Sequence, residues 1–502
     1  MIGGAVLVLA GYAAFQGAPA ASLERAVHFY EARQWDQAEA EASAVLKADP
    51  RMGDAEVLLG LIATVRSQWP KAQEHFERAV ALQPGNPRAR SYLGATYLQE
   101  KRFPEAAGAF RKALELDPQN STAQYNLGVI ALAQHSPSQA LDHFQKVLRA
   151  NSSDIPSLIG SMESQLLLER IPDAQRSAHE LDKLLPDNDP RLFQAASLLA
   201  QHGQSSSAIP LLERARRAYP LSYEVSYNLA LADLETNQLA QAADVLQPFT
   251  GAQGKAEAFD LLGQIEDKRG HSEAAEHDFH EAAQRDPANE DYLFDYGNAL
   301  LQHGKLESAV TAFRAAVAAH ANSWKLRFGL GSAFYLSGDY GSAVQELLEA
   351  VRLKPGSATA YFLLGEAYDS AGSQQSAIER ALTAYLKTAP HDPWAYYHDA
   401  VIHQNEESLR QALRLDPNFA EAYLELGILA LAKGQTATAI TQLEKAVKLA
   451  PALAAAHYRL GLAYQKVGNT ERAQAELAQF RSLKNRETYR ARVLEGLAAA
   501  GK

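Results

Sequence analysis

The sequence predicts an all-α solenoid built from repeated helical hairpins, and three regular spacings lead to this prediction. A fixed period of 20–50 residues is typical of stacked supersecondary units rather than of separate globular domains. Glycine recurs twelve residues before many of the periodic alanines, and proline falls near the end of most units, as at Pro50, Pro84 and Pro118. The alanines are spaced by 34 residues, with one step of 33, and are Ala38, Ala72, Ala106, Ala140, Ala174, Ala208, Ala242, Ala275, Ala309, Ala343 and Ala377.

The unit at residues 87–120 shows why these residues recur. Gly94 lies on the first predicted helix, and Ala106 and Phe110 lie on the second, each within an apolar stripe of helical period. Gly94 and Ala106 lack bulk, so the two backbones can approach closely where the helices cross, and Phe110 fills the space beside that crossing. Glycine inside a helix costs about 1 kcal/mol relative to alanine, so its recurrence implies a packing role. Pro118 cannot continue the second helix and marks its end.

The same positions resemble the tetratricopeptide repeat (TPR) signature. The match is carried by Leu93-Gly94, Tyr97, Ala106, Phe110, Ala113 and Pro118, and the pattern recurs in phase about fourteen times between residues 22 and 487. The resemblance implies about fourteen antiparallel helix pairs stacked into a right-handed superhelix. It further implies that the first helix of each pair lines the concave face, and that the chain binds other proteins.

The predicted organisation has five parts. Residues 1–21 are a leader-like or hydrophobic N-terminal segment, 22–392 a TPR array, 393–419 a TPR with a shortened second helix, 420–487 a further array, and 488–502 a C-terminal capping helix. The last helix is amphipathic, with apolar residues Tyr489, Val493, Leu494 and Leu497. We expect it to cover the last exposed apolar face of the solenoid.

The N-terminal segment predicts export. The apolar run from Ala5 to Phe15 is shorter than the ~20 residues that span a bilayer. Ala18 and Ala20 follow at the positions that a signal peptidase reads, which predicts cleavage before Ala21. No positive charge precedes the apolar run, so the alternative is an uncleaved first helix. We therefore expect an exported protein of the periplasm or cell envelope, with a cytoplasmic protein as the alternative.

The net charge and the absence of cysteine exclude some classes of partner and site. The formal net charge is −11 and 47% of the residues are hydrophobic, which suits a folded acidic protein and argues against nucleic acid as a general partner. A basic stretch at 481–502 is interpreted as a solvated helix face rather than an anion-docking patch. The chain has no cysteine, so disulfides, thiolate metal sites and a cysteine nucleophile are excluded.

No catalytic residue, metal site or cofactor is expected, because the repeats leave no room for a catalytic fold. The segment 251–255 only loosely resembles a phosphate loop, since it lacks the spacer and the Ser/Thr after its lysine. His277 and His280 are spaced i,i+3 rather than the i,i+4 of helical metal ligands. The aromatic and histidine-rich segment 391–403 is interpreted mostly as core, with His398 anomalous because glycine or alanine is usual at its position.

The candidate partner-binding residues are aromatic. They occupy the fifth position of the first helix in several units, together with one tyrosine further along the same stripe: Tyr125, Phe193, Tyr227, Phe294, Phe328, Tyr335, Phe362 and Tyr458. We expect them to form a discontinuous ladder that holds an extended or helical peptide in the concave groove. The alternative is that these rings pack between adjacent repeats.

The leading functional hypothesis is thus a non-catalytic scaffold that binds proteins or peptides in a bacterial cell-envelope assembly, which includes membrane-associated complexes. No nucleic acid and no small-molecule cofactor is expected. The alternative is a cytosolic TPR adaptor or co-chaperone.

Overall fold

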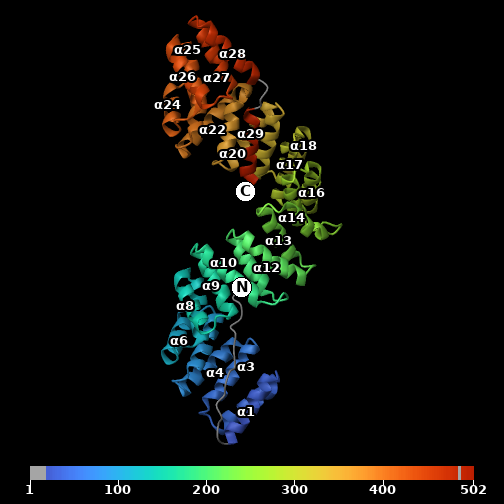
Figure 1. The fold of residues 1–502 in the computed structure, drawn as a ribbon, viewed down its shortest axis with the longest axis vertical. Coiled ribbons are helices and arrows are strands. Elements are labelled where there is room, and N and C mark those ends of the chain that lie inside the picture. Colours follow the sequence, from blue (N-terminus) through green and yellow to red (C-terminus); the bar gives the residue numbers. More distant parts are fainter. Residues whose placement is uncertain (1–17, 484–487, 502) are drawn as a thin grey trace. The chain divides into compact units, whose positions relative to one another are not determined.

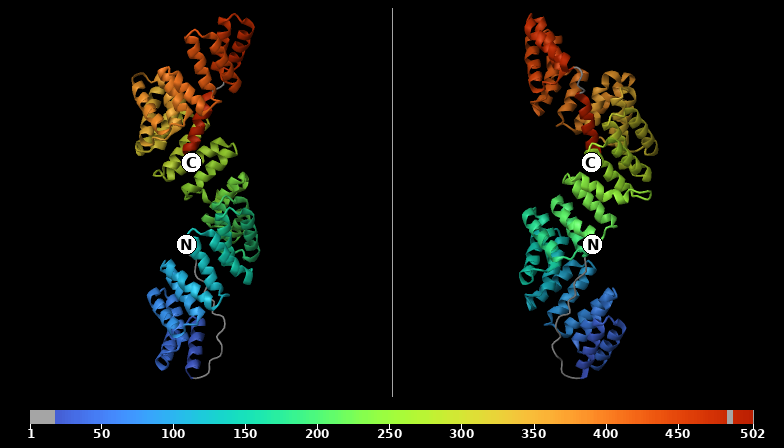
Figure 2. Two further views of the ribbon diagram at one scale, coloured as in Figure 1. Left: turned by 90° about the vertical axis from the view of Figure 1, so that its left-hand side faces the viewer. Right: turned by 45° about the vertical axis from the view of Figure 1, so that its right-hand side comes forward.

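A computed structural model describes residues 18–483 and 488–501, and this part of the chain is helical, with loops between the helices. It holds 29 α-helices and three short 3₁₀ helices, which confirms the predicted all-α fold. Contacts divide the chain into two compact units with the boundary between Asn237 and Gln238 (Figures 1 and 2). The predicted leader lies mostly outside the described residues. None of the described helices has both the length and the apolar character needed to cross a membrane.

The first unit contains thirteen of the described helices. They are α1 (Ala18–Glu31), α2 (Trp35–Ala48), α3 (Gly53–Val65), α4 (Trp69–Leu82), α5 (Pro87–Gln99), α6 (Phe103–Leu116), α7 (Ser121–Ala133), α8 (Pro137–Ala150), α9 (Ile155–Leu167), α10 (Ile171–Leu184), α11 (Arg191–Gln201), α12 (Ser205–Ala218) and α13 (Tyr223–Glu235).

The second unit contains the remaining helices. They are α14 (Leu239–Leu246), η1 (Gln247–Phe249), α15 (Ala256–Lys268), α16 (Ser272–Arg285), α17 (Glu290–Gln302), α18 (Leu306–Ala319), α19 (Trp324–Leu336), α20 (Tyr340–Leu353), α21 (Ala358–Glu366), η2 (Tyr368–Ser370), η3 (Gly372–Gln374), α22 (Gln375–Thr388), α23 (Pro393–His403), α24 (Glu406–Leu415), α25 (Ala420–Ala432), α26 (Thr436–Leu449), α27 (Ala454–Lys466), α28 (Thr470–Leu483) and α29 (Thr488–Gly501). In chain order, α1–α12 make six successive pairs in the first unit and α15–α28 make seven in the second, close to the predicted count.

Polar caps and prolines define where the helices begin and end. The Asn120 side chain accepts a hydrogen bond from the Ala123 N–H at 2.9 Å and starts α7. The Ser323 hydroxyl does the same for the Leu326 N–H at the start of α19. Such caps stabilise a helix by about 1 kcal/mol each. At the other end, α6 stops two residues before Pro118, as the sequence predicts.

Most glycines of the repeat lie where a helix crosses a large side chain of the next helix, a phenylalanine ring at Gly128 and a leucine at Gly331. A Cβ atom added to Gly128 on α7 would lie 2.6 Å from the Phe144 ring on α8. The same ring also faces Gly160 on α9, where an added Cβ would lie 2.5 Å away. Phe144 is fully buried. A ring held between two glycines therefore joins one helix pair to the next, and Phe313 repeats this arrangement between Gly297 and Gly329.

Replacing Gly128 with leucine is expected to lower the free energy of unfolding by about 1–3 kcal/mol, because the added side chain overpacks this crossing. The matched control is Gly108→Leu, which should leave the free energy of unfolding nearly unchanged. Gly108 lies on α6, and an added Cβ there meets no atom within 4 Å. Denaturant unfolding of both variants checks the assignment, and an unfolding midpoint unchanged in Gly128→Leu would contradict it.

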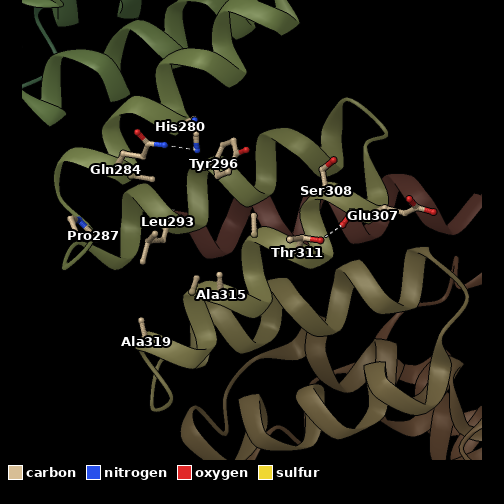
Figure 3. A pocket seen from close by; sticks show the side chains of 13 residues that line it. His280, Gln284, Pro287, Leu293, Tyr296, Glu307, Ser308, Thr311, Ala315 and Ala319 are labelled. Carbon is tan, nitrogen blue, oxygen red and sulfur yellow. Dashed lines mark hydrogen bonds between the residues drawn. The ribbon is translucent and has the colours of Figure 1, made fainter. Parts of the chain in front are cut away.

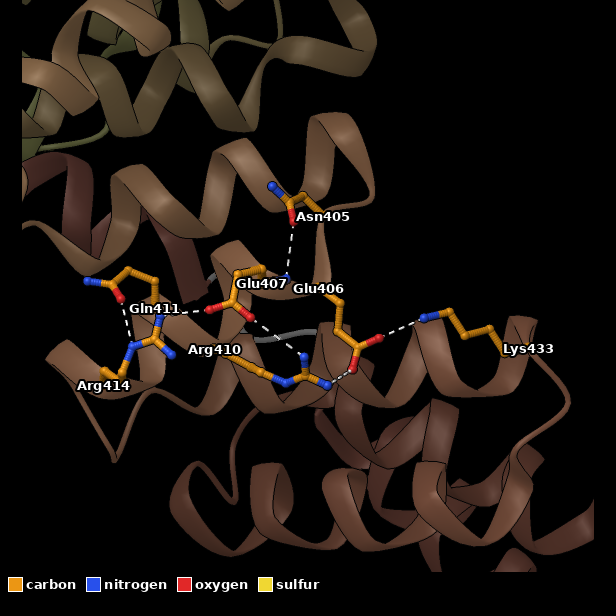
Figure 4. Close-up of polar contacts among 7 residues, drawn as sticks. All are labelled: Asn405, Glu406, Glu407, Arg410, Gln411, Arg414 and Lys433. Atoms are coloured by element: carbon orange, nitrogen blue, oxygen red, sulfur yellow. Dashed lines mark hydrogen bonds and ion pairs between the residues drawn. The ribbon is translucent and has the colours of Figure 1, made fainter.

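The predicted short pair is α23 and α24, and both of its helices are short. They have 11 and 10 residues, against the usual 13 and 14, so the prediction that only the second helix shortens is incomplete. Charged contacts tie this pair to α25 (Figure 4). The Glu406 carboxylate bonds Lys433 at 2.6 Å and Arg410, and Lys433 holds the pKa of Glu406 below its usual range. Because these groups are exposed, each contact contributes roughly 1 kcal/mol or less.

The C-terminal helix is present as α29, but its position differs from the prediction. We expected it to cover the end of the array, at α28. It packs instead against α17, α19 and α21 (Figures 1 and 2). Its Val493 and Leu497 are fully buried in the core cluster of those helices. The apolar stripe is therefore real, but sequence position alone does not tell which apolar surface it covers.

Candidate functional site

The first helices of successive pairs form a shared inner face in the second unit. Helix α17 packs against α19, and α19 packs against α21. We call the surface that these three helices present to α29 the unit 2 groove. The repeat places equivalent residues side by side along it, since successive first helices are offset by one period of 34 residues. The groove therefore carries rows of side chains rather than one isolated cluster.

Helix α29 occupies the unit 2 groove at close range. Its Gly496 comes so near α21 that an added Cβ would lie 2.2 Å from Cγ2 of Thr359. At its C-terminal end, an added Cβ on Gly501 would lie 3.6 Å from the Phe294 ring and 3.7 Å from Oδ1 of Asp295. Glycine permits this approach because it has no side chain. The groove is thus shaped to receive a helix with small residues on its contacting face.

Three of the predicted aromatic ladder residues form the buried floor of this region. Phe294, Phe328 and Phe362 are at most 1% exposed. Phe294 packs on Phe313 with ring centroids 5.9 Å apart, and Phe362 packs on Trp394 at 4.9 Å. With α29 in place, these rings offer no free surface to a partner. They support the groove from below, which is the alternative that the sequence left open.

The other predicted aromatics keep more exposure. Tyr125, Phe193 and Tyr227 of the first unit are half-buried, as is Tyr335 of the second, while Tyr458 is 38% exposed. Most of them rest on neighbouring rings, as Tyr125 does on Phe144 at 5.7 Å between centroids. Burial raises the pKa of Tyr125 and of Tyr335 above the usual tyrosine value. The structure therefore divides the eight predicted residues into a buried group and a more exposed group.

Polar residues of the unit 2 groove were missed by the sequence argument. Lys325, on α19, is largely buried, forms an ion pair with Asp291 of α17, and places its ammonium 4.7 Å from the centroid of the Phe294 ring. Two further buried atoms, Asn298 Oδ1 on α17 and Ser332 Oγ on α19, have no hydrogen-bond partner among the described residues. Asp291, Lys325 and Asn298 each lie three or four residues from the aromatic position of their helix, and thus on the same face. A search of that whole face would have found them.

Two carboxyl groups add acidic character beside the groove. Asp260 on α15 lies 34 residues before Phe294, so it takes the aromatic position of its own repeat. Burial raises the pKa of Asp260 to about 6. Burial, reinforced by Asp260, raises the pKa of Asp295 to about 7. These two carboxyl groups favour a positively charged neighbour. Lys325 is already paired with Asp291, so among the residues named here no unpaired cation serves this role.

The stability of the second unit is expected to fall as pH rises from about 4 to about 7. The unfolded carboxyls release their protons near pH 3.9, whereas folded Asp295 and Asp260 keep theirs to about 7 and about 6. The folded state thus binds more protons in this range, so stability decreases with pH.

Thermal unfolding between about pH 4 and pH 8 measures this slope. Asp295→Asn should flatten it, whereas Asp369→Asn, at an exposed position, serves as the control and should leave it unchanged. A slope that is identical in the wild type and in Asp295→Asn would contradict the prediction.

A second concavity of about 690 Å³ lies among α16, α17 and α18 (Figure 3). Its wall is mostly apolar, with several alanines of α18 and Leu293. Some of its polar groups are already engaged: Gln284 bonds His280 at 3.1 Å, and Thr311 donates to the Glu307 carbonyl at 2.9 Å. His280 also packs on the Tyr296 ring, at 4.8 Å between centroids. Such a mostly apolar wall offers few polar groups to orient a small ligand.

The loop at 251–255 is confirmed as a connection between helices, not a phosphate site. It lies between η1 and α15. The Arg285 guanidinium donates to the carbonyl oxygens of Ala252 and Gly254, both at 3.1 Å. A phosphate loop presents N–H groups to an anion, whereas this loop presents carbonyls to a cation. Among the described residues, no three His, Cys, Asp or Glu side chains are placed to hold a metal ion.

The anomalous His398 is a core residue. It is 2% exposed and packs on Phe362 and Trp394, with ring centroids 5.5 and 5.9 Å away. The imidazole ring occupies room left by Gly365 in the preceding helix pair. An added Cβ on Gly365 would lie 2.2 Å from Nδ1 of His398. The expected ring of that pair is missing, since Ala381 stands sixteen residues after Gly365. The histidine of the next pair therefore fills the gap.

Comparison with known proteins adds family and fold information. Profiles described as tetratricopeptide repeats match more than half of the chain, over residues 23–87, 65–121, 102–155, 193–252, 261–323, 297–358, 328–393, 408–441 and 454–484, and one described as a TPR repeat matches 429–468. No curated protein matches the sequence.

Among solved structures, PilW, a widely conserved type IV pilus biogenesis factor, is 21% identical with a TM-score of 0.38, covering 42% of this chain and 98% of its own. Pseudomonas aeruginosa PilF is 22% identical with a TM-score of 0.37, covering 41% and 95%. The Cut9–Hcn1 complex of the APC/C is 12% identical with a TM-score of 0.34, covering 96% of each chain.

Proposed function

Because this chain belongs to the tetratricopeptide repeat family, we propose that it is a non-catalytic scaffold that binds partner proteins or peptides on the inner face of its helix pairs. The observation that carries the proposal is the unit 2 groove, where three first helices already accept a helix, α29. A groove of this kind offers an apolar floor and rows of polar side chains at fixed spacing. Both are what helix-in-groove recognition requires.

The charge of the groove favours one class of partner. Asp295 lies along it on α17, Asp260 lies beside it on α15, and Lys325, its buried base, is paired with Asp291. A basic clamp for a partner's carboxylate therefore finds no support here, and this argues against the co-chaperone alternative. We expect instead a partner segment that is apolar on one side and carries positive charge, whose binding weakens as salt increases.

Site-specific photocrosslinking in the native cell tests the binding surface. A photoreactive amino acid at Tyr335, half-buried on α19, should capture partner proteins, which mass spectrometry then identifies. The same group at Gln345, exposed on the second helix α20, is the matched control. The same proteins captured from Gln345 and not from Tyr335 would place the binding surface on the outer helices.

The proposed location is the cell envelope, and its support is the sequence before Ala21. An apolar run followed by small residues at Ala18 and Ala20 is typical of a cleaved export signal. We expect the protein isolated from its own cells to begin near Ala21. N-terminal sequencing by mass spectrometry tests this, and a retained Met1 on cytosolic protein would favour the adaptor alternative.

A further inference from the structure

Helix α29 behaves in the structure as an intramolecular ligand of the unit 2 groove. It follows α28 in the chain, yet it packs against α17, α19 and α21, which lie more than 120 residues earlier in the sequence. It makes this contact as one continuous helix of 14 residues. Val493 and Leu497 are completely buried and stand four residues apart, one helical turn, so they form a single stripe.

The fit between α29 and the groove is tight at Gly496 and looser at Gly501. Gly496 meets Thr359 so closely that only glycine fits without displacement, since an added Cβ would lie 2.2 Å from Cγ2 of Thr359. Gly501 is also near the groove wall, but an added Cβ there would have ordinary contacts of 3.6 Å or more. The middle of the helix is therefore tightly constrained, whereas its C-terminal end tolerates a methyl group.

The groove also has a charge preference along the helix axis. The C-terminal end of α29 lies beside Asp295, with an added Cβ on Gly501 3.7 Å from its Oδ1. A helix C-terminus carries partial negative charge, so a carboxylate beside it is unfavourable unless a cation is nearby. A helix that brings lysine or arginine to this end therefore suits the groove better than an acidic one.

We propose that the unit 2 groove is a binding site for an amphipathic α-helix of a partner protein, and that α29 closes this site until the partner displaces it. This inference rests on the proposed scaffold function and names the partner's chemistry. The partner helix has two apolar residues four apart, a glycine three residues after the first, and a basic residue at its C-terminal end. A tethered competitor has an effective concentration of order millimolar, so it lowers the apparent affinity of any helix added in solution.

The test uses the full chain and a fluorescent peptide of the sequence of residues 488–501. Two substitutions release α29 by different means: Gly496→Leu clashes with Thr359, and Leu497→Asp places a charge in a fully buried position. Gly501→Ala is the matched control, because its methyl group fits. Fluorescence polarisation measures peptide binding to each chain, and hydrogen exchange over residues 488–501 reports whether α29 has left the groove.

We expect both releasing variants to bind the peptide at least about tenfold more tightly than the wild type and Gly501→Ala. A peptide with aspartate in place of Val493 and Leu497 should bind none of them. Equal binding by all four chains, binding by none, or continued protection of α29 in both releasing variants would overturn the inference.

These results are separate from the crosslinking test of the proposed function. Partner capture from Tyr335 without peptide binding would reject only the helix-displacement inference. Peptide binding without any partner capture would reject the proposed scaffold role at this face and leave the groove's property standing.

Discussion

Replacing Phe144 with alanine is expected to lower the free energy of unfolding of the first unit by about 3–5 kcal/mol. The ring is fully buried between Gly128 and Gly160, which face it from two successive helix pairs. Neither glycine has a side chain that can move into the vacated space, so the cavity persists. Because the ring joins two pairs, its loss weakens both a hairpin and the interface to its neighbour.

Denaturant unfolding followed by circular dichroism measures the effect of Phe144→Ala, with Gln145→Ala, exposed on the same helix, as the control. The control should change the free energy of unfolding by no more than about 0.5 kcal/mol. A Phe144→Ala loss as small as that of the control would show that the ring does not hold the pairs together.

Replacing Phe328 with alanine is the second large expected effect, again about 3–5 kcal/mol, this time in the second unit. Phe328 is 1% exposed in the cluster that also receives Val493 and Leu497 of α29. Tyr335, on the same helix, is half-buried and rests on Tyr340 at 5.4 Å between centroids. Its replacement by alanine removes less buried surface and should cost less stability.

The two substitutions therefore separate core from surface roles when made one at a time. Thermal unfolding and partner capture are measured for each. We expect Phe328→Ala to lower the unfolding midpoint strongly, and Tyr335→Ala to weaken partner capture while most of the stability remains. The reverse pattern, with Tyr335→Ala the more destabilising, would contradict the assignment of Phe328 to the core.

The repeat architecture was predictable because its cause is local and periodic. The close helix crossing at Gly94 and the ring of Phe110 that fills it recur at one spacing, and the structure confirms the contact, with an added Cβ on Gly94 2.9 Å from that ring. Proline ends helices through its own covalent geometry, so boundaries such as that before Pro118 are also readable. Such features need no knowledge of distant residues.

The parts that were not predictable depend on contacts between distant segments. The amphipathic stripe of α29 is visible in the sequence, but several apolar surfaces can bury it, and the choice of the unit 2 groove depends on the fit of Gly496 to Thr359. His398 similarly fills a gap that arises because Ala381 replaces a ring in the preceding pair. Compensation of this kind joins residues of different repeats and leaves no local periodic signal.

The candidate site could be inferred only in part from the sequence. The aromatic stripe predicts one face of the first helices as the binding surface, but the structure buries Phe294 and Phe362. The groups that give the groove its charge, Asp260, Asp295 and Lys325, were missed because their significance depends on burial and on their ion pairs. Function at such a face follows from these particular side chains rather than from the fold.

The closing of the unit 2 groove by α29 is tested most directly by an engineered disulfide, because the natural chain has no cysteine. An added Cβ on Gly496 would lie 2.9 Å from Cβ of Thr359, so a small outward shift reaches the about 3.5–4.5 Å that a disulfide requires. On oxidation, Thr359→Cys with Gly496→Cys should give an intramolecular bond, seen as a faster non-reducing gel band and a linked peptide in mass spectrometry. The control pair is Gln345→Cys with Gly496→Cys. Because Gln345 is exposed on α20, this pair should form no intramolecular bond. Equal linkage in both pairs, or no intramolecular bond in the first, would show that α29 does not occupy the groove.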